Sequence, residues 1–193
     1  MNNINKGRLE AITDGIIAIA ATIMVLELHT PLTNDWAGLK DLRTTFVAYI
    51  ISFFMIYFVW RMHHDLFNQA EIITRRAFMC NGIWLFFLTL VPFTTGWIGS
   101  APDATLPALL YPVNLLLWSL SFHLMYYQIK KDNPEMQKHT KRIAWNRIIM
   151  YVGYSISIVL AFFYPIWSMR TVGIVTIIII IRFLVSKRVE ADL

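Results

Sequence analysis

Two acidic side chains interrupt the first apolar stretch of the chain, which runs from Leu9 to Leu28. Asp14 lies inside the stretch and Glu27 lies near its far end. About 20 mostly apolar residues are long enough to cross a bilayer as a helix. A charged side chain costs roughly 2.5–3.5 kcal/mol at the centre of such a helix, so it is rarely found there without a partner. These carboxylates could attract cations, transfer protons or tie the helix to its neighbours.

Branched apolar residues recur every three or four positions along the same stretch, which places them on one face of a helix. They are Ile12, Ile16, Ile19, Ile23 and Leu26, called the isoleucine stripe below. The opposite face carries Thr13, Asp14 and Ala21. We interpret the stripe as a lining face and the opposite face as the one that packs inside the protein. The alternative is that the stripe only packs against neighbouring helices.

The remaining reactive residues are few and do not form a catalytic or metal-binding pattern. His63 and His64 are adjacent and point about 100° apart on a helix, so a structural or hydrogen-bonding role is favoured over metal ligation. The single cysteine, Cys80, excludes an intrachain disulfide and a cysteine metal cluster. The sequence has no glycine-rich phosphate loop, HExxH motif, nucleophile elbow or TVGYG-like potassium filter. We therefore expect no enzymatic activity, no metal and no cofactor.

The composition predicts the elements that hold these residues. Hydrophobic residues make up 57% of the 193 residues and charged residues 15%, whereas a soluble domain carries about 25% charged residues. Six continuous apolar runs favour an all-α polytopic membrane protein, because only helices and closed barrels satisfy the backbone in lipid. Asp14 argues against a cleaved signal peptide at the N-terminus. The expected helices, all in one domain over 1–193, are about 9–28, 44–61, 77–98, 106–129, 148–169 and 171–186.

Basic residues are distributed unevenly over the connections between these helices. Thirteen fall on the side of the termini: Lys6, Arg8, Arg61, Arg75, Arg76, Lys130, Lys131, Lys138, Lys141, Arg142, Arg147, Lys187 and Arg188. Three fall on the other side, at Lys40, Arg43 and Arg170, and Arg182 lies inside the last helix. The positive-inside rule therefore places both termini in the cytoplasm. The net charge of +5 then reflects topology and contact with anionic lipid, and we expect no nucleic-acid partner.

The stretch RLEAITDGIIAIAATIMVLEL, from Arg8 to Leu28, resembles the first helix of the transmembrane protein 175 family. These are potassium-permeable channels of lysosomes and prokaryotes, with an Arg-x-x-x-Phe-Ser-Asp-Gly signature followed by Ala-Ile, a Thr and a Leu-Glu-rich end. The matching positions are Arg8, Asp14, Gly15, Ala18, Ile19, Thr22, Leu26 and Glu27. Two positions depart: Ile12 replaces an aromatic packing residue, and Thr13 replaces the serine.

Two further motifs extend the resemblance over roughly the first half of the chain. The end of the second helix, from Trp60 through His63 to Phe67, is similar to the family's Trp-x-x-His-x-x-x-Phe pattern. In the third helix, Asn81 and the later Pro92-Phe93 are similar to its Asn…Pro-Phe pattern. The later helices agree with the family only in number and hydrophobicity.

The resemblance implies a homotetramer of six-helix subunits in the cytoplasmic membrane of a prokaryote, surrounding a pore lined by the first helices. Potassium is then the permeant ion, and membrane lipid and three further copies of the chain are the partners. Carried over residue by residue, the hydrophobic constriction is formed by Ile19, Ile23 and Leu26. Such rings can gate a narrow pore by dewetting. Thr22 is the polar pore-lining residue, whose hydroxyl meets a partly dehydrated ion.

The two carboxylates each have two interpretations. We favour Asp14 as part of an internal structural network, because a buried carboxylate must be paired or hydrogen-bonded. Its partner would be Arg8, Thr13, His63 or His64, and the family resemblance implies a network of the Arg, Asp and His residues. The alternative is that Asp14 faces a cytoplasmic vestibule and attracts cations. Glu27 either raises the cation concentration at the outer mouth or is a solvated charge at the end of the helix.

Other functions compete with a passive channel. A proton-coupled transporter would use Asp14 with His63 and His64 as a relay, but it is expected to show broken helices or inverted repeats, which the sequence lacks. An intramembrane enzyme would need paired catalytic groups at one depth. A non-conducting scaffold remains an alternative.

The charge distribution predicts that Ser100 and Lys138 lie on opposite sides of the membrane. With Cys80 removed, a cysteine at position 100 should react with an impermeant thiol reagent from outside, and one at position 138 only after permeabilisation. Labelling of both cysteines from the same side would contradict the six-helix topology.

Overall fold

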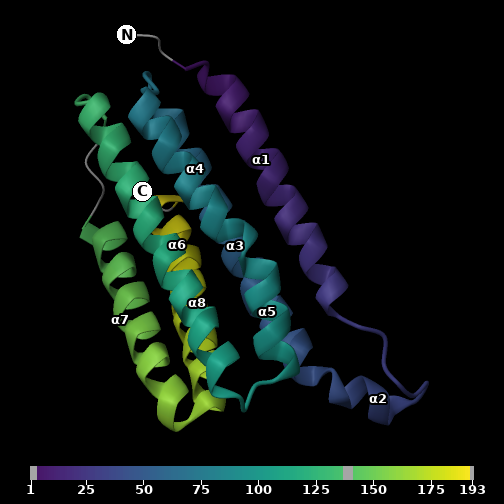
Figure 1. Cartoon of the computed structure of the whole chain (residues 1–193). Coiled ribbons are helices and arrows are strands. Elements are labelled where there is room, and N and C mark those ends of the chain that lie inside the picture. Colours follow the sequence, from purple (N-terminus) through teal and green to yellow (C-terminus); the bar gives the residue numbers. More distant parts are fainter. Residues whose placement is uncertain (1–3, 137–140, 192–193) are drawn as a thin grey trace.

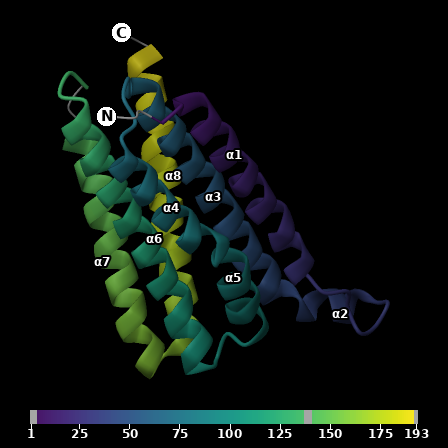
Figure 2. The same ribbon diagram turned by 45° about the horizontal axis from the view of Figure 1, so that its top comes forward.

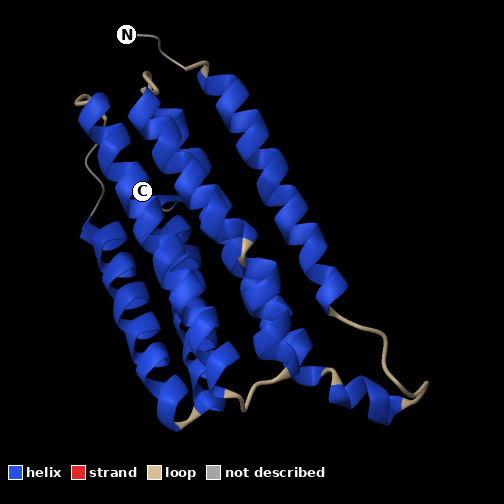
Figure 3. Cartoon of the chain, in the orientation of Figure 1, coloured by secondary structure: helices blue, strands red, loops and turns tan. Residues whose placement is uncertain are grey.

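The computed structural model describes residues 4–136 and 141–191, and its regular elements are all helical (Figures 1 and 3). In chain order they are α1 (Lys6–Ile23), the 3₁₀ turn η1 (Met24–Glu27), α2 (Trp36–Asp41), α3 (Arg43–Gln69), α4 (Arg75–Thr89), α5 (Val91–Ser100), α6 (Thr105–Asp132), α7 (Lys141–Phe163) and α8 (Pro165–Ala191). Six spans among the described residues are long and apolar enough to cross a membrane. The expected all-α, six-helix class is confirmed.

The break between the last two spanning helices differs from the expected one. The hydrophobic runs suggested helices over 148–169 and 171–186, whereas α7 ends at Phe163 and α8 begins at Pro165. Proline has no N–H to donate to the preceding turn, and its fixed φ suits the first position of a new helix. Hydrophobicity continues through this turn, so the apolar run alone did not reveal the break.

Two other spans differ in length or continuity. The helix expected to end at residue 61 continues as α3 to Gln69, because a helix can extend beyond the apolar segment that fills the bilayer. The span expected over 77–98 consists of α4 and α5, interrupted at Leu90 just before Pro92 (Figure 3). Pro92 lies in the first turn of α5, where its missing N–H is not needed.

Helix α6 forms the centre of the bundle, and α1 stands at its edge (Figure 1). Helix α6 packs against α4, α5, α7 and α8. Helix α1 has substantial contacts only with α3, α4, α5 and η1. Three buried hydroxyls join α3, α5 and α6: Thr95 donates to Ser52 at 2.7 Å, and Ser52 lies 2.9 Å from the Tyr111 hydroxyl. Helix α1 therefore packs on α3, α4 and α5, two of which, α3 and α5, are joined to α6 by these hydroxyls.

The connections of the bundle are sorted between its two ends (Figures 1 and 2). The start of α1, the α3–α4 connection and the end of α6 lie at one end. Helix α2 and the α5–α6 and α7–α8 connections lie at the other, which we call the α2 end. The basic residues at the start of α1, at the α3–α4 connection and at the end of α6 therefore share an end, whereas Lys138 lies outside the described residues. Which end faces the cytoplasm remains a prediction.

Candidate functional site

Helix α1 is buried along only one arc of its surface. The residues in that arc are Leu9, Thr13, Ile17 and Ala20. In the isoleucine stripe, Ile16 is half-buried, and the exposed fractions of the side chains are 60% for Ile12, 57% for Ile19, 46% for Ile23 and 72% for Leu26. Apart from Ile16, which packs partly against the core, the stripe is therefore exposed on its own subunit.

The buried arc does not lie opposite the stripe, as the sequence suggested. At about 100° per residue, it is centred roughly a quarter-turn from the stripe. Of the three residues expected to pack inside, Thr13 is buried, Ala21 is half-buried and Asp14 is exposed. A third arc remains, which carries Ala11, Gly15, Ala18 and Thr22 and is exposed as well. Helix α1 thus presents two uncovered arcs: the stripe and this small-residue arc, with Asp14 at its far edge.

A buried hydrogen-bonded chain ties α1 to α3 and α4. Asn81 donates from Nδ2 to the Thr13 hydroxyl at 2.9 Å, and its Oδ1 lies 3.0 Å from Nε2 of His63. Because Oδ1 can only accept, His63 carries a proton on Nε2 in this arrangement. All three side chains are at most 1% exposed. The imidazole is stacked between the rings of Phe67 and Trp84, at centroid distances of 4.1 and 4.8 Å.

Asp14 belongs to a separate contact. Its Oδ1 accepts a hydrogen bond from Nε1 of Trp60 at 2.9 Å, which links α1 to α3 near the surface. His64 stacks on Trp60 and accepts from the Asn68 amide at 2.8 Å. Arg8 is exposed, and its backbone N–H donates to the Asn5 side chain. Among the described residues, the one ion pair joins Arg61 to Asp65 at 3.0 Å, so Arg8 does not pair with Asp14.

The expected five-residue network is therefore divided. The structure brings Thr13 and His63 together through Asn81, and it places Asp14 on Trp60. Arg8 lies outside both contacts, and His64 meets the second only by stacking on Trp60. Sequence reasoning did not assign roles to Asn81 and Trp60. Their places in the second-helix and third-helix motifs were the signal that could have identified them.

Asp14 closes one end of an apolar groove between α1 and α3, with a volume of about 360 Å³. The groove is lined by Asp14, Ile17, Ala18, Ala21, Phe53, Ile56, Tyr57 and Trp60. Asp14 is the one charged group among them. Farther along α1, Thr22 is exposed, and its hydroxyl lies 2.9 Å from the carbonyl oxygens of both Ala18 and Ile19.

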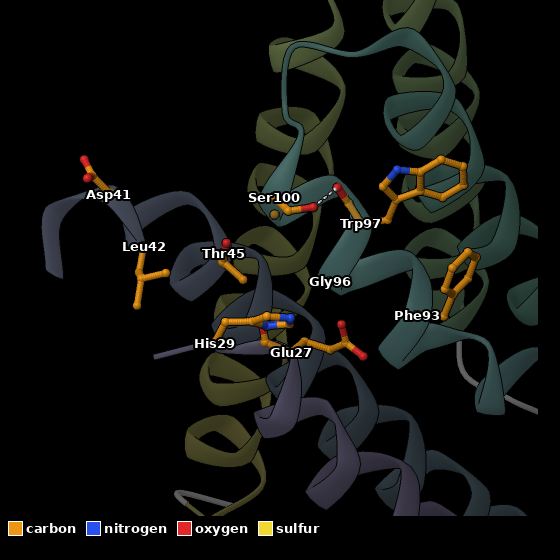
Figure 4. Close-up of a pocket in the computed structure, with 10 residues that line it drawn as sticks. Glu27, His29, Asp41, Leu42, Thr45, Phe93, Gly96, Trp97 and Ser100 are labelled. Carbon is orange, nitrogen blue, oxygen red and sulfur yellow. Dashed lines mark hydrogen bonds between the residues drawn. The ribbon is translucent and has the colours of Figure 1, made fainter. Parts of the chain in front are cut away.

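Glu27 lies in a larger cavity of about 630 Å³ at the α2 end (Figure 4). The labelled lining residues come from η1, the loop after it, α2, α3 and α5. Glu27 is half-buried, and its carboxylate lies against the backbone of Gly96 in α5. Its position is therefore neither that of a fully solvated charge nor on the exposed stripe.

Comparison with known proteins identifies a family and similar bacterial proteins at the sequence level. The model of the family described as endosomal/lysosomal potassium channel TMEM175 matches residues 8–92. A protein of Chryseobacterium sp. strain P1-3, named a potassium channel, is 34% identical over 193 residues, and the match covers 97% of each chain.

A solved structure and a mammalian protein are also similar. The crystal structure of a lysosomal potassium-selective channel TMEM175 homologue from Chamaesiphon minutus aligns with a TM-score of 0.79 at 26% identity, covering 92% of this chain and 97% of that one. The rat endosomal/lysosomal proton channel TMEM175 is 24% identical over 188 residues, and the match covers 87% of this chain but 37% of the rat protein.

Replacing Asn81 by alanine should destabilise the protein by leaving the His63 N–H and the Thr13 hydroxyl without their partner. Each unsatisfied buried group costs about 1–3 kcal/mol. Asn68→Ala is the matched control, because Asn68 is exposed and bonds within its own helix, and we expect an effect within about 0.5 kcal/mol. The loss of monodisperse protein on heating in detergent measures both. Equal melting temperatures for the two variants would show that the buried hydrogen bonds of Asn81 do not hold α1 in place.

Proposed function

This chain belongs to the TMEM175 family of ion channels, and from that premise we propose that it conducts potassium passively across a cell membrane. The family consists of channels and not of enzymes, which confirms the prediction that the chain is not an enzyme. Relatives from Chryseobacterium, Streptomyces collinus and Chamaesiphon minutus carry the name potassium channel. Potassium is the permeant ion in this proposal and not a bound cofactor.

The observation that carries the proposal is the double exposure of α1. One uncovered arc is the isoleucine stripe, and the other carries small residues with Asp14 at its edge. Lipid could cover the stripe, but a carboxylate facing hydrocarbon is costly. Small residues let helix backbones approach closely within membranes. The small-residue arc is therefore suited to a neighbouring copy of the chain, which leaves the stripe to face a central axis.

We infer a tetramer, in which four copies of α1 surround the pore. Homo-oligomers usually have closed symmetry, and a ring around one axis forms when a head-to-tail interface closes on itself. Rings of Ile19, Ile23 and Leu26 form the constriction, which passes ions only when it is wet. Thr22, beside these rings, presents its hydroxyl oxygen to the permeating ion. The thirteen-to-three distribution of basic residues supports cytoplasmic termini and an outward-facing α2 end.

The alternative of a proton-coupled transporter has less support. A relay needs Asp14, His63 and His64 to be connected, but each has a different hydrogen-bond partner: Trp60, Asn81 and Asn68, respectively. Within the described residues of the spans, the interruption at Leu90 is a single residue followed directly by α5, which is shorter than the unwound segments typical of transporter binding sites.

Ion flux from proteoliposomes tests the proposal. Purified protein in potassium-loaded vesicles should release potassium down its gradient in a neutral-pH buffer without any proton gradient, and protein-free vesicles should not. Parallel sodium and caesium gradients give the ion preference. An internal pH dye reports proton movement, which matters because the rat relative is named a proton channel. Potassium release that occurs only when a proton gradient is imposed would favour the transporter instead.

Ile19→Asn should widen and wet the ring that we expect to be the narrowest or second narrowest of the proposed pore. A lumen-facing isoleucine loses few contacts on replacement, whereas truncating a packed one costs about 2–5 kcal/mol. We therefore expect the variant to stay tetrameric, to conduct more and to discriminate less between potassium and sodium. Flux assays and size-exclusion chromatography measure these properties.

Ile19→Cys provides an independent check in a background without Cys80. In the conducting protein it should react with water-soluble thiol reagents. An unreactive cysteine in a channel that demonstrably conducts, together with a destabilised Ile19→Asn, would show that the stripe is a packing face and that the pore lies elsewhere.

A further inference from the structure

The tightened turn at the end of α1 aligns two side chains toward α5 and α3. In a 3₁₀ helix, residues three apart lie directly above one another. Met24 and Glu27 are therefore on the same side of η1; Met24 is fully buried and Glu27 is half-buried. Ile23, at the junction with α1, and Leu26 are both exposed on the other side. The 3₁₀ winding of η1 therefore sets both the position of the Glu27 side chain and the direction of the Leu26 side chain.

Two glycines of α5 allow close approach, Gly96 to this turn and Gly99 to α3. A Cβ atom added to Gly96 would overlap the carboxylate end of Glu27, and one added to Gly99 would lie 2.7 Å from the Cα atom of Thr45 in α3. The exposed Gly82 of α4, by contrast, has no atom within 4 Å of such a Cβ. Gly96 therefore leaves a seat that only a glycine provides, and the Glu27 side chain occupies it.

The seat, rather than a polar bond, accounts for the position of Glu27. Within the part of the chain that the structure describes, its carboxylate has neither a hydrogen-bond donor nor a cationic partner from the protein. The carboxylate instead borders the 630 Å³ cavity at the α2 end (Figure 4), where water can solvate it. A long side chain with an apolar stem and a polar tip can thus pack on Gly96 and remain hydrated.

We propose that Glu27 is a positioning residue: seated against Gly96, it holds the 3₁₀ winding of η1 and so fixes the direction of Leu26. The consequence for conduction rests on the proposed function, because Leu26 is then the outermost ring of the constriction. The seat itself is a property of the single subunit and can be tested separately.

A cysteine at position 26, in a background with Cys80 replaced by serine, reports the freedom of η1 through its alkylation rate by a water-soluble maleimide. Gly96→Ala should displace the Glu27 side chain while leaving α5 folded, because alanine is the better helix former. We expect the rate to rise by at least about twofold, the lower range for coupled neighbours. The matched control Gly82→Ala should leave it unchanged. A second reporter, Ile12→Cys, should not respond, which excludes general loosening of α1.

A double-mutant cycle tests whether Gly96→Ala changes the alkylation rate through the Glu27 side chain. Glu27→Ala should raise the rate at position 26 by itself, and Gly96→Ala should add nothing in that background, because the side chain it displaces is gone. Glu27→Gln keeps the length of the side chain and should keep the wild-type rate. Additive effects of Glu27→Ala and Gly96→Ala would contradict the proposed role of Glu27. A rate for Glu27→Gln equal to that of Glu27→Ala would contradict it as well.

Potassium efflux from vesicles separates this inference from the proposed function. If the unaltered protein conducts, loss of the seat in Gly96→Ala should change the potassium flux, and Gly82→Ala should not. Absence of flux in the unaltered protein would contradict the channel, while the alkylation cycle would still decide the seat. Normal flux with an additive cycle would retain the channel and reject the role of Glu27.

Discussion

The amide of Asn81 fixes how α1 is rotated on the bundle, and the uncovered surfaces of α1 follow from that rotation. Its oxygen and nitrogen are used by His63 and Thr13, in a site where no more than 1% of each side chain is exposed. In a bilayer, no bulk water is at hand to replace a lost partner, so unpaired polar groups are costly. Turning α1 by one residue, or about 100°, would remove Thr13 from Asn81 and direct another side chain at the buried amide. The hydrogen-bonded chain therefore selects one orientation of α1.

A second attachment holds the opposite end of the same helix. Met24 is buried, and Glu27 lies against Gly96, so the turn after α1 is fixed to α5 as the first half is fixed to α4. Between these attachments, Ile17 and Ala20 make apolar contacts along the same arc. A helix held at two points on one side keeps the rest of its circumference free. For a channel subunit this combines a defined position relative to the bundle with a surface that remains available to other copies and to water.

The sequence predicted those features that depend on the spacing of neighbouring residues along the chain. Continuous apolar runs gave six helices, and the spacing of the isoleucines gave a face that the structure leaves exposed. Periodicity shows that a face exists but not which neighbouring arc is buried, so Asp14 was placed inside when it lies at the surface. The turn at Tyr164 was missed because Pro165 sits within an unbroken hydrophobic run. The partners of Asp14 and Thr13 come from residues 46 and 68 positions away in the chain, and a single sequence does not reveal such pairings.

The geometry of Thr22 bears on how an apolar constriction could still prefer cations. A ring of isoleucine side chains offers no ligand, so an ion crossing it must keep most of its water. The Thr22 hydroxyl is within 2.9 Å of two carbonyl oxygens of its own helix, and its proton is therefore directed at the backbone. The oxygen is left with acceptor capacity only on its exposed side. In the proposed tetramer, four such oxygens beside Ile19 and Ile23 would replace hydration water around a cation but would offer an anion no donor. If the proposed pore is correct, the internal hydrogen bond of Thr22 would favour cations without any charged side chain at the constriction.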